Sequence, residues 1–172
     1  LPDTYTVSLD GREVSVTEND WFAPPDPVRE GYEFIGWEDE SGQILTFPRK
    51  IEGDISCTPV FEAVEYTVDY WLNGGYVEGA VQNTFTMETG TLELPVPEKE
   101  GQTFEGWYLT ADYSGVPVER IECTCSDVKV YARWSDATYT VLYELDGGTM
   151  YEKNPESVTA ETEYTLADPV RE

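Results

Sequence analysis

Apolar and polar residues alternate along stretches of the chain that open with the same tripeptide, Tyr-Thr-Val. The clearest stretch covers residues 66–72, and residues 139–145 repeat its alternation. The apolar positions of the first of these are Tyr66, Val68, Tyr70 and Leu72. A period of two residues is the pattern of a β-strand that buries one face. The chain is therefore predicted to be mainly β.

Turn signals follow each of these stretches. Asp10-Gly11, followed by Val14-Ser15-Val16, predicts a tight hairpin. The later copies instead carry Gly74-Gly75 and Gly147-Gly148, where we expect a longer excursion before the chain returns. In the second copy, the partner strand is expected within residues 82–87.

A motif ending in Phe-x-x-Trp occurs twice, at Phe34 and Trp37 and again at Phe104 and Trp107. Two residues three positions apart point to opposite faces of a regular strand. The intervening Gly36 or Gly106 could form a bulge that turns both aromatic rings inward. We expect such a bulge in each copy. We also expect four aromatic residues at equivalent positions in the core: Trp37, Trp107, Trp134 and Phe61.

Helix signals are weak. Residues 48–52 and 117–122 each begin with proline and could form one or two helical turns, which would make the fold α+β. Pro59 lies within an expected closing strand, although proline cannot donate to a β-ladder. Either Pro59 lies past the paired part of that strand, or the strand is irregular.

The landmarks repeat with a fixed period, since Trp37 and Trp107 are 70 residues apart, as are Pro27 and Pro97. Such a period indicates one small module in tandem. We divide the chain into modules at 1–64 and 65–136 and the N-terminal half of a third at 137–172. An orphan half followed by two permuted modules is the alternative. Both ends are expected to be cuts in a longer protein, and the remnant should be frayed or paired with the edge of a neighbouring sheet.

Four landmarks occur in the same order in both copies: a Tyr-Thr-Val strand, a glycine turn, the Pro-to-Gly-x-Phe-x-Gly-Trp motif and a closing aromatic strand, as in Tyr131-Ala132-Arg133-Trp134. This order resembles the Listeria–Bacteroides repeat family, the internalin-B-type B repeat. The first copy departs from it by its Asp10-Gly11 hairpin and by ending in Val60-Phe61. The resemblance implies a bacterial surface or secreted protein made of tandem modules with a β-grasp fold like that of ubiquitin or SUMO, and it implies no particular ligand.

The charge narrows the range of partners. The chain has 35 acidic and 10 basic residues, a net charge of −25. The negative electrostatic field of this charge repels phosphate backbones and anionic membranes, so we expect no nucleic-acid partner. No stretch of about 18 apolar residues predicts a membrane span, so no direct membrane insertion of this segment is expected. Each repeat is expected to contact the neighbouring repeats of the same chain.

The residue types argue against catalysis. The chain has no histidine, so a Ser-His or Cys-His nucleophile cannot form within it. Cys57 aligns with Val130 and is expected in the core, while Cys123 and Cys125 are too close in sequence for a well-formed disulfide. The acidic residues form no calcium-loop pattern. We expect no enzyme activity, no metal and no cofactor.

Two tryptophans do not recur between copies, and they are the candidate ligand contacts. Trp71 lies on the outward parity of its strand, where a bare indole suits sugar stacking or a protein contact. Trp21 precedes a proline-rich connection. The alternative to ligand contact is a structural role. Trp71 would then cover the junction between adjacent modules, and Trp21 would hold the proline-rich connection in place.

Two functions fit these observations. In the first, the repeats form the stalk or spacer of an extracellular bacterial surface protein and present other domains. In the second, they are an adhesin-type module that binds a host glycan or glycoprotein through an exposed, non-repeating aromatic residue beside a groove.

Overall fold

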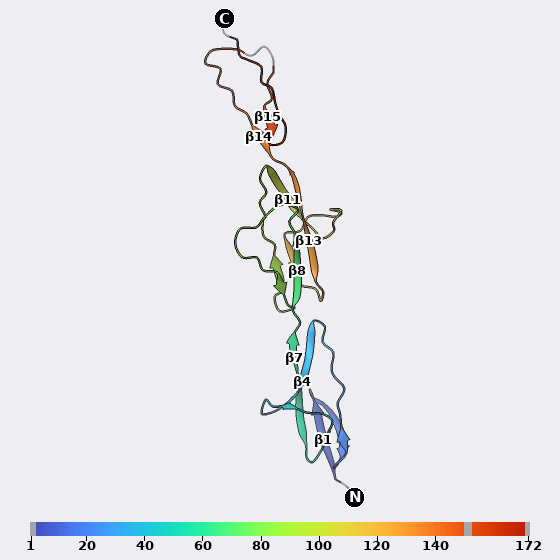
Figure 1. Cartoon of the computed structure of the whole chain (residues 1–172). Coiled ribbons are helices and arrows are strands. Elements are labelled where there is room, and N and C mark those ends of the chain that lie inside the picture. Colours follow the sequence, from blue (N-terminus) through green and yellow to red (C-terminus); the bar gives the residue numbers. More distant parts are fainter. Residues whose placement is uncertain (1–2, 150–152, 171–172) are drawn as a thin grey trace. The chain divides into compact units, whose positions relative to one another are not determined.

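The computed structural model describes residues 3–149 and 153–170 of the chain, and all regular structure in these residues is β (Figure 1). The prediction of a mainly β protein is confirmed. No helix within the described ranges is long and apolar enough to cross a membrane. The strands of the first half are β1 (Thr4–Leu9), β2 (Arg12–Thr17), β3 (Trp21–Phe22), β4 (Tyr32–Asp39), β5 (Ile44–Leu45), β6 (Arg49–Lys50) and β7 (Ile55–Ala63). Those of the remainder are β8 (Tyr66–Trp71), β9 (Thr84–Phe85), β10 (Thr91–Glu93), β11 (Gln102–Tyr108), β12 (Arg120–Glu122), β13 (Val128–Asp136), β14 (Thr138–Thr140) and β15 (Ser157–Thr159).

The chain forms two compact units. Unit 1 contains Leu1–Tyr66, Thr84–Gly90 and Cys123–Ser126. Unit 2 contains Thr67–Asn83, Thr91–Glu122 and Asp127–Glu172.

The sheet of unit 1 has the strand order β2-β1-β7-β4-β5. The predicted hairpin is confirmed: β1 and β2 pair antiparallel, and only Asp10 and Gly11 separate the partners Leu9 and Arg12. Both turn residues have positive φ, 49° and 79°, as a two-residue hairpin requires. The same pair of positive angles recurs at residues 73–74 and 146–147, so the three copies share one turn geometry despite their different sequences.

The first and last strands of unit 1 are parallel neighbours. β1 pairs with β7 from Val7↔Ile55 to Leu9↔Cys57, and β7 pairs with β4 on its other side. Pro59 lies two residues after Cys57, the last residue of β7 that pairs with β1, and it lies opposite Trp37 of β4. The first of the two expectations for Pro59 is therefore met for the pairing with β1. For the pairing with β4, Pro59 lies within the paired part and next to the register shift, so the second expectation of an irregular strand is met there.

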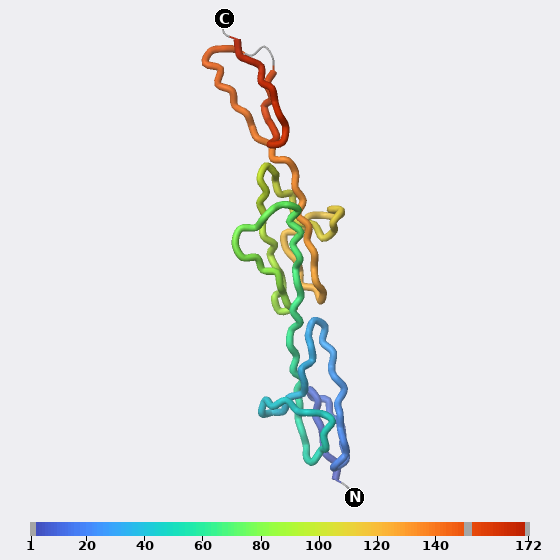
Figure 2. The backbone as a smooth tube through the Cα atoms, in the orientation of Figure 1, coloured from blue at the N-terminus to red at the C-terminus, as the bar shows by residue number. Residues whose placement is uncertain are grey.

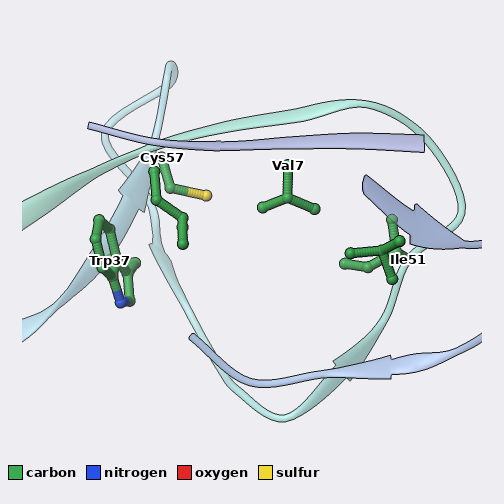
Figure 3. Packing of buried hydrophobic residues seen from close by; sticks show 6 residues of the cluster. Val7, Trp37, Ile51 and Cys57 are labelled. Atoms are coloured by element: carbon green, nitrogen blue, oxygen red, sulfur yellow. The ribbon is translucent and has the colours of Figure 1, made fainter. Parts of the chain in front are cut away.

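The core of unit 1 lies on one face of this sheet (Figure 3). Val7, Trp37, Ile51 and Cys57 are buried there, as expected for Cys57. Ile51 follows β6 directly and is fully buried, so the short β3–β6 ribbon is attached to the core through it.

In the second full copy, the sheet order is β11-β13-β8-β9, and β8 and β13 are parallel neighbours, as β1 and β7 are. The chain leaves β8 through the turn at Asn73 in the expected excursion, seen as the green loop of Figure 2. It returns at residue 83, whose carbonyl accepts a hydrogen bond from the Val68 N–H at 2.8 Å. The predicted partner strand is thus confirmed as β9.

Both predicted bulges are present. The register shifts between Phe34 and Gly36 in β4 and between Phe104 and Gly106 in β11. Each shift turns the Phe and Trp of the motif toward the same side, where their rings pack edge to face. The ring centroids are 5.8 Å apart in β4 and 5.6 Å apart in β11.

Of the four aromatic residues expected in the core, Trp37 and Trp107 are buried, whereas Trp134 and Phe61 are half-buried. The prediction is wrong for the latter two. They lie toward the edge of their cores, opposite Phe104 and Phe34 across the sheet. Trp134 also covers the turn after β8, because its Nε1 donates to the Leu72 carbonyl at 2.9 Å.

The two possible helical turns are not formed. Residues 49–50 are strand β6, paired with β3, and residues 120–122 are strand β12, paired with β10. One isolated turn of helix fixes several dihedral angles for very few hydrogen bonds. Pairing with β3 or β10 gives backbone N–H and C=O groups of these residues hydrogen-bond partners on the other strand. The extended conformation is therefore favoured over an isolated helical turn.

The expectation for residues 138–172 also needs correction. In its described part, β14 pairs with β15 of the same segment, and a bridge joins Thr149 to Val170. Backbone N–H and C=O groups of the segment therefore bond to each other, and not to the edge strand of a neighbouring sheet. It still leaves apolar side chains in solvent, with Leu142 88% exposed.

Candidate functional site

Trp71 lies at the end of β8 in unit 2 and is 49% exposed. Its register partner in β13 is Tyr131, and the two rings face each other at a tilt, with centroids 5.8 Å apart. The indole Nε1 donates to Oδ2 of Asp69 at 2.9 Å. The indole is thus held in place on two sides while half of its surface stays open, which reduces the entropy that a ligand would have to remove.

This aromatic pair is not repeated. The residue equivalent to Tyr131 in the first copy is Thr58, and the residue equivalent to Trp71 in the third is Glu144. Trp71 lines neither the hollow beside Trp21 nor the hollow between Asn73 and Arg133. The pair therefore forms an open platform on the sheet.

Trp21 is the more exposed of the two candidates, at 68%, and it belongs to unit 1. It lines a hollow of about 600 Å³. Its register partner across the β3–β6 ribbon is Lys50, and Arg49 stands beside it opposite Phe22. The hollow is lined by Trp21, Gln43, Ile44, Leu45, Thr46, Pro48, Arg49, Lys50 and Glu52. It combines a bare aromatic face with two cations in a strongly acidic chain.

A third arrangement, in unit 2, was not found from the sequence. A hollow of about 530 Å³ is lined by Asn73, Lys99, Gln102, Asp112, Tyr113, Arg133 and Trp134. Its polar groups are largely engaged within the fold. Lys99 Nζ donates to the Asn73 carbonyl at 3.0 Å, and Arg133 pairs with Glu105 at 2.7 Å. Hydrogen bonds from the side chains of Thr110 and Ser114 lower the pKa of Asp112, so this carboxylate stays ionised.

The cysteines show no sign of activation. Burial raises the pKa of the Cys57 thiol and also that of Cys123, which favours the neutral form over the nucleophilic thiolate. The Cys125 thiol contacts Met87 Sδ at 3.5 Å. Within residues 3–149 and 153–170, no three His, Cys, Asp or Glu residues gather in a way that could hold a metal ion.

Sequence reasoning found both tryptophans but missed their neighbours. Tyr131 and Lys50 are 60 and 29 positions away from the indoles they face. The strand register places each pair together, and no local pattern carries that register. The alternation within residues 128–134 could have put Tyr131 on the outward face, but it could not have placed that residue beside Trp71.

Residues 5–55 and 66–133 match the Listeria–Bacteroides repeat domain. A predicted Gly-rich membrane protein of Evansella cellulosilytica is 29% identical over 176 residues, which cover 96% of this chain and 20% of that protein. Internalin H of Listeria monocytogenes is 32% identical over 118 residues, which cover 63% of this chain and 21% of that protein. This chain thus spans about a fifth of the length of these two relatives. No solved structure gives a significant match.

Proposed function

This chain belongs to the Listeria–Bacteroides repeat family, and we propose that it is a non-catalytic stalk or spacer that presents other domains of an extracellular bacterial surface protein. Its relatives support this setting, since they include a predicted membrane protein and an internalin. We also propose that its modules are β-grasp-like. The parallel pairing of first and last strands, flanked by antiparallel partners, supports that assignment.

The observation that carries the stalk proposal is this parallel pairing. In unit 1 the chain enters through β1 and leaves through β7, and the two strands run side by side in the same direction. Tension on the ends of the unit pulls these strands past each other. Their hydrogen bonds are then loaded together instead of opening one by one. The same relation holds between β8 and β13. Such modules resist extension, which is what a spacer at a cell surface requires.

Single-molecule pulling on the full chain tests the proposal. When the chain is held at its two ends, unit 1 should unfold in one step that releases about 60 residues, from β1 to β7. Extended chain spans about 3.5 Å per residue, so the expected gain in length is about 200 Å. The control pulls the same chain between cysteines placed at Thr4 and Thr17, where the antiparallel β1–β2 pair opens one bond at a time. End pulling should require the higher force, and equal forces would contradict the stalk.

A second candidate function is favoured by the platform of Trp71 and Tyr131. An aromatic pair that is half open to solvent, with its indole held by Asp69, suits a host glycan or glycoprotein. On this proposal the second repeat is an adhesin-type binding module.

Its test is binding of the full chain to a panel of host glycans and matrix glycoproteins. Trp71→Ala should abolish the binding, and so should Tyr131→Thr, which installs the residue of the first copy. Tyr139→Ala removes a comparably exposed ring outside the platform and should have no effect. A folded chain that binds nothing on the panel, or that binds equally with Trp71→Ala, would exclude this role for the platform.

A further inference from the structure

Each full copy contains a short two-stranded ribbon beside its main sheet. In unit 1 it is β3–β6, and in unit 2 it is β10–β12. When the two copies are aligned by sequence, a buried isoleucine occupies the same position at each ribbon, Ile51 in the first and Ile121 in the second. The residue before each isoleucine is a cation, Lys50 or Arg120.

The surroundings of these two cations are opposite in character. The residue across the ribbon from Lys50 is Trp21, whereas the residue across from Arg120 is Glu93. The residue preceding the cation is Arg49 in the first ribbon and Glu119 in the second. The first ribbon therefore offers an indole and two positive charges, and the second offers two carboxylates around one positive charge.

The charge of Lys50 is available to a ligand, whereas that of Arg49 also acts on Asp39, where it adds to the side-chain hydrogen bond from Ser41 in lowering the pKa of this carboxyl. Among the residues that the structure describes, neither Arg49 nor Lys50 has a carboxylate within ion-pairing distance. In the described part of the chain, Glu52 is the one carboxylate that lines the hollow beside Trp21. Arg49 also lines a neighbouring hollow together with Asp39 and Asp54. Lys50 lines only the hollow beside Trp21, so of the two cations it is the main candidate to bind a ligand there.

We propose that the hollow beside Trp21 binds an acidic glycan, a polysaccharide whose sugar rings carry carboxylates. The apolar C–H face of one ring stacks on the exposed indole. A ring carboxylate accepts charge-assisted hydrogen bonds from Lys50 and Arg49. The net charge of −25 repels polyanions from most of the protein surface. Binding of an acidic glycan is therefore confined to the positively charged hollow of Arg49 and Lys50. The proposal goes beyond the stalk and does not depend on it, because one is tested by binding and the other by force.

The experiment is calorimetric titration of the full chain with tetragalacturonate, with galactotetraose as the neutral ligand of similar size. We expect saturable binding of the acidic ligand at one site per chain and no binding of the neutral one. Trp21→Ala and Lys50→Glu should each weaken binding at least about tenfold, the loss expected for one stacking contact or one charge-assisted pair. Tyr139→Ala is the matched control, because it removes an exposed ring that does not line the hollow, and it should bind as the unaltered chain does.

Trp21 and Lys50 are exposed, so these variants are expected to fold, and near-UV circular dichroism verifies this. Three results would overturn the proposal: no binding of tetragalacturonate, equal binding of galactotetraose, or undiminished binding by Trp21→Ala. Loss with Lys50→Glu alone would show simple charge attraction without a stacking site. Glu93→Trp combined with Glu119→Arg gives the second ribbon the character of the first. In a folded double variant, the stoichiometry should rise to two, and a stoichiometry of one would contradict the assignment of these residues.

Discussion

The carboxylate of Asp54 accepts a hydrogen bond of 2.7 Å from the backbone N–H of Thr6, 48 residues earlier in the chain. Asp54 comes just before β7, and Thr6 lies within β1, so the bond joins the first and last strands of the module where their parallel pairing begins. The second copy repeats the relationship, with Asp127 accepting from the Thr67 N–H at 2.8 Å. A side chain thus completes the ladder at the point where β7 or β13 has not yet begun.

This bond should contribute measurably to stability in both units. Asp54→Ala and Asp127→Ala leave a strand N–H without its partner, and each should lower the free energy of unfolding by about 1 kcal/mol. Urea denaturation followed by tryptophan fluorescence measures the loss. Asparagine at either position keeps an acceptor oxygen and should lose less. A loss as large with asparagine as with alanine would show that the charge, and not the hydrogen bond, matters.

The bulge glycines should not tolerate a side chain. Gly106 has φ of 136°, and a Cβ there would lie 2.5 Å from Cβ of Pro117. Gly106→Ala should therefore destabilise unit 2 by about 2–4 kcal/mol, from backbone strain and overpacking together. Thermal unfolding monitored by circular dichroism checks this. Gly53→Ala is the control, because Gly53 has no strained φ and open space at its Cβ. A similar shift in both variants would argue against the bulge as the cause.

The two motif tryptophans should respond differently to phenylalanine. Trp107 Nε1 donates to the Pro95 carbonyl at 2.7 Å, whereas the buried Nε1 of Trp37 has no hydrogen-bond partner among the described residues. Trp107→Phe leaves a carbonyl unpaired as well as a cavity, but Trp37→Phe removes an already unpaired donor. Trp107→Phe should therefore cost about 1–2 kcal/mol more. The comparison is made by urea denaturation of the two variants, and equal losses would refute it.

Unit 1 should lose stability in mild alkali. Burial raises the pKa of the Cys57 thiol in the folded state, while an unfolded cysteine titrates near about 8.5. The unfolded chain therefore loses this proton first, so the folded form is favoured fully below that pH and progressively less above it. The urea midpoint of unit 1 should fall between pH 8 and pH 9.5. Cys57→Val, which installs the residue found at position 130, should reduce this fall, and an unchanged slope would assign it to other groups.

Much of the fold follows from short-range sequence patterns. The alternation at residues 66–72 identifies β8, and Asp10-Gly11 identifies the first hairpin. The spacing of Phe104 and Trp107 around a glycine is enough to predict the bulge, because burial of both rings is incompatible with a regular strand. The Trp-to-Trp period indicates the tandem copies. Each of these signals lies within a few residues or in direct repetition.

The remainder is set by pairing between distant segments. β6 has only two residues and no periodicity to detect, and it is a strand because β3 lies opposite it. The same register that forms this ribbon puts Trp21 beside Lys50, and the register of β8 with β13 puts Trp71 beside Tyr131.

The sequence by itself determined the repeat, the β class, the hairpin and bulge positions, and which tryptophans are unique to one copy. Only the tertiary structure decided which side chains meet Trp21 and Trp71, and that Asp54 reaches Thr6. The physical reason is that side-chain alternation reports which face of a strand is buried, whereas the partners across a sheet depend on register. Register is fixed by the sum of core packing and long-range hydrogen bonds, and no local stretch of the chain encodes that sum.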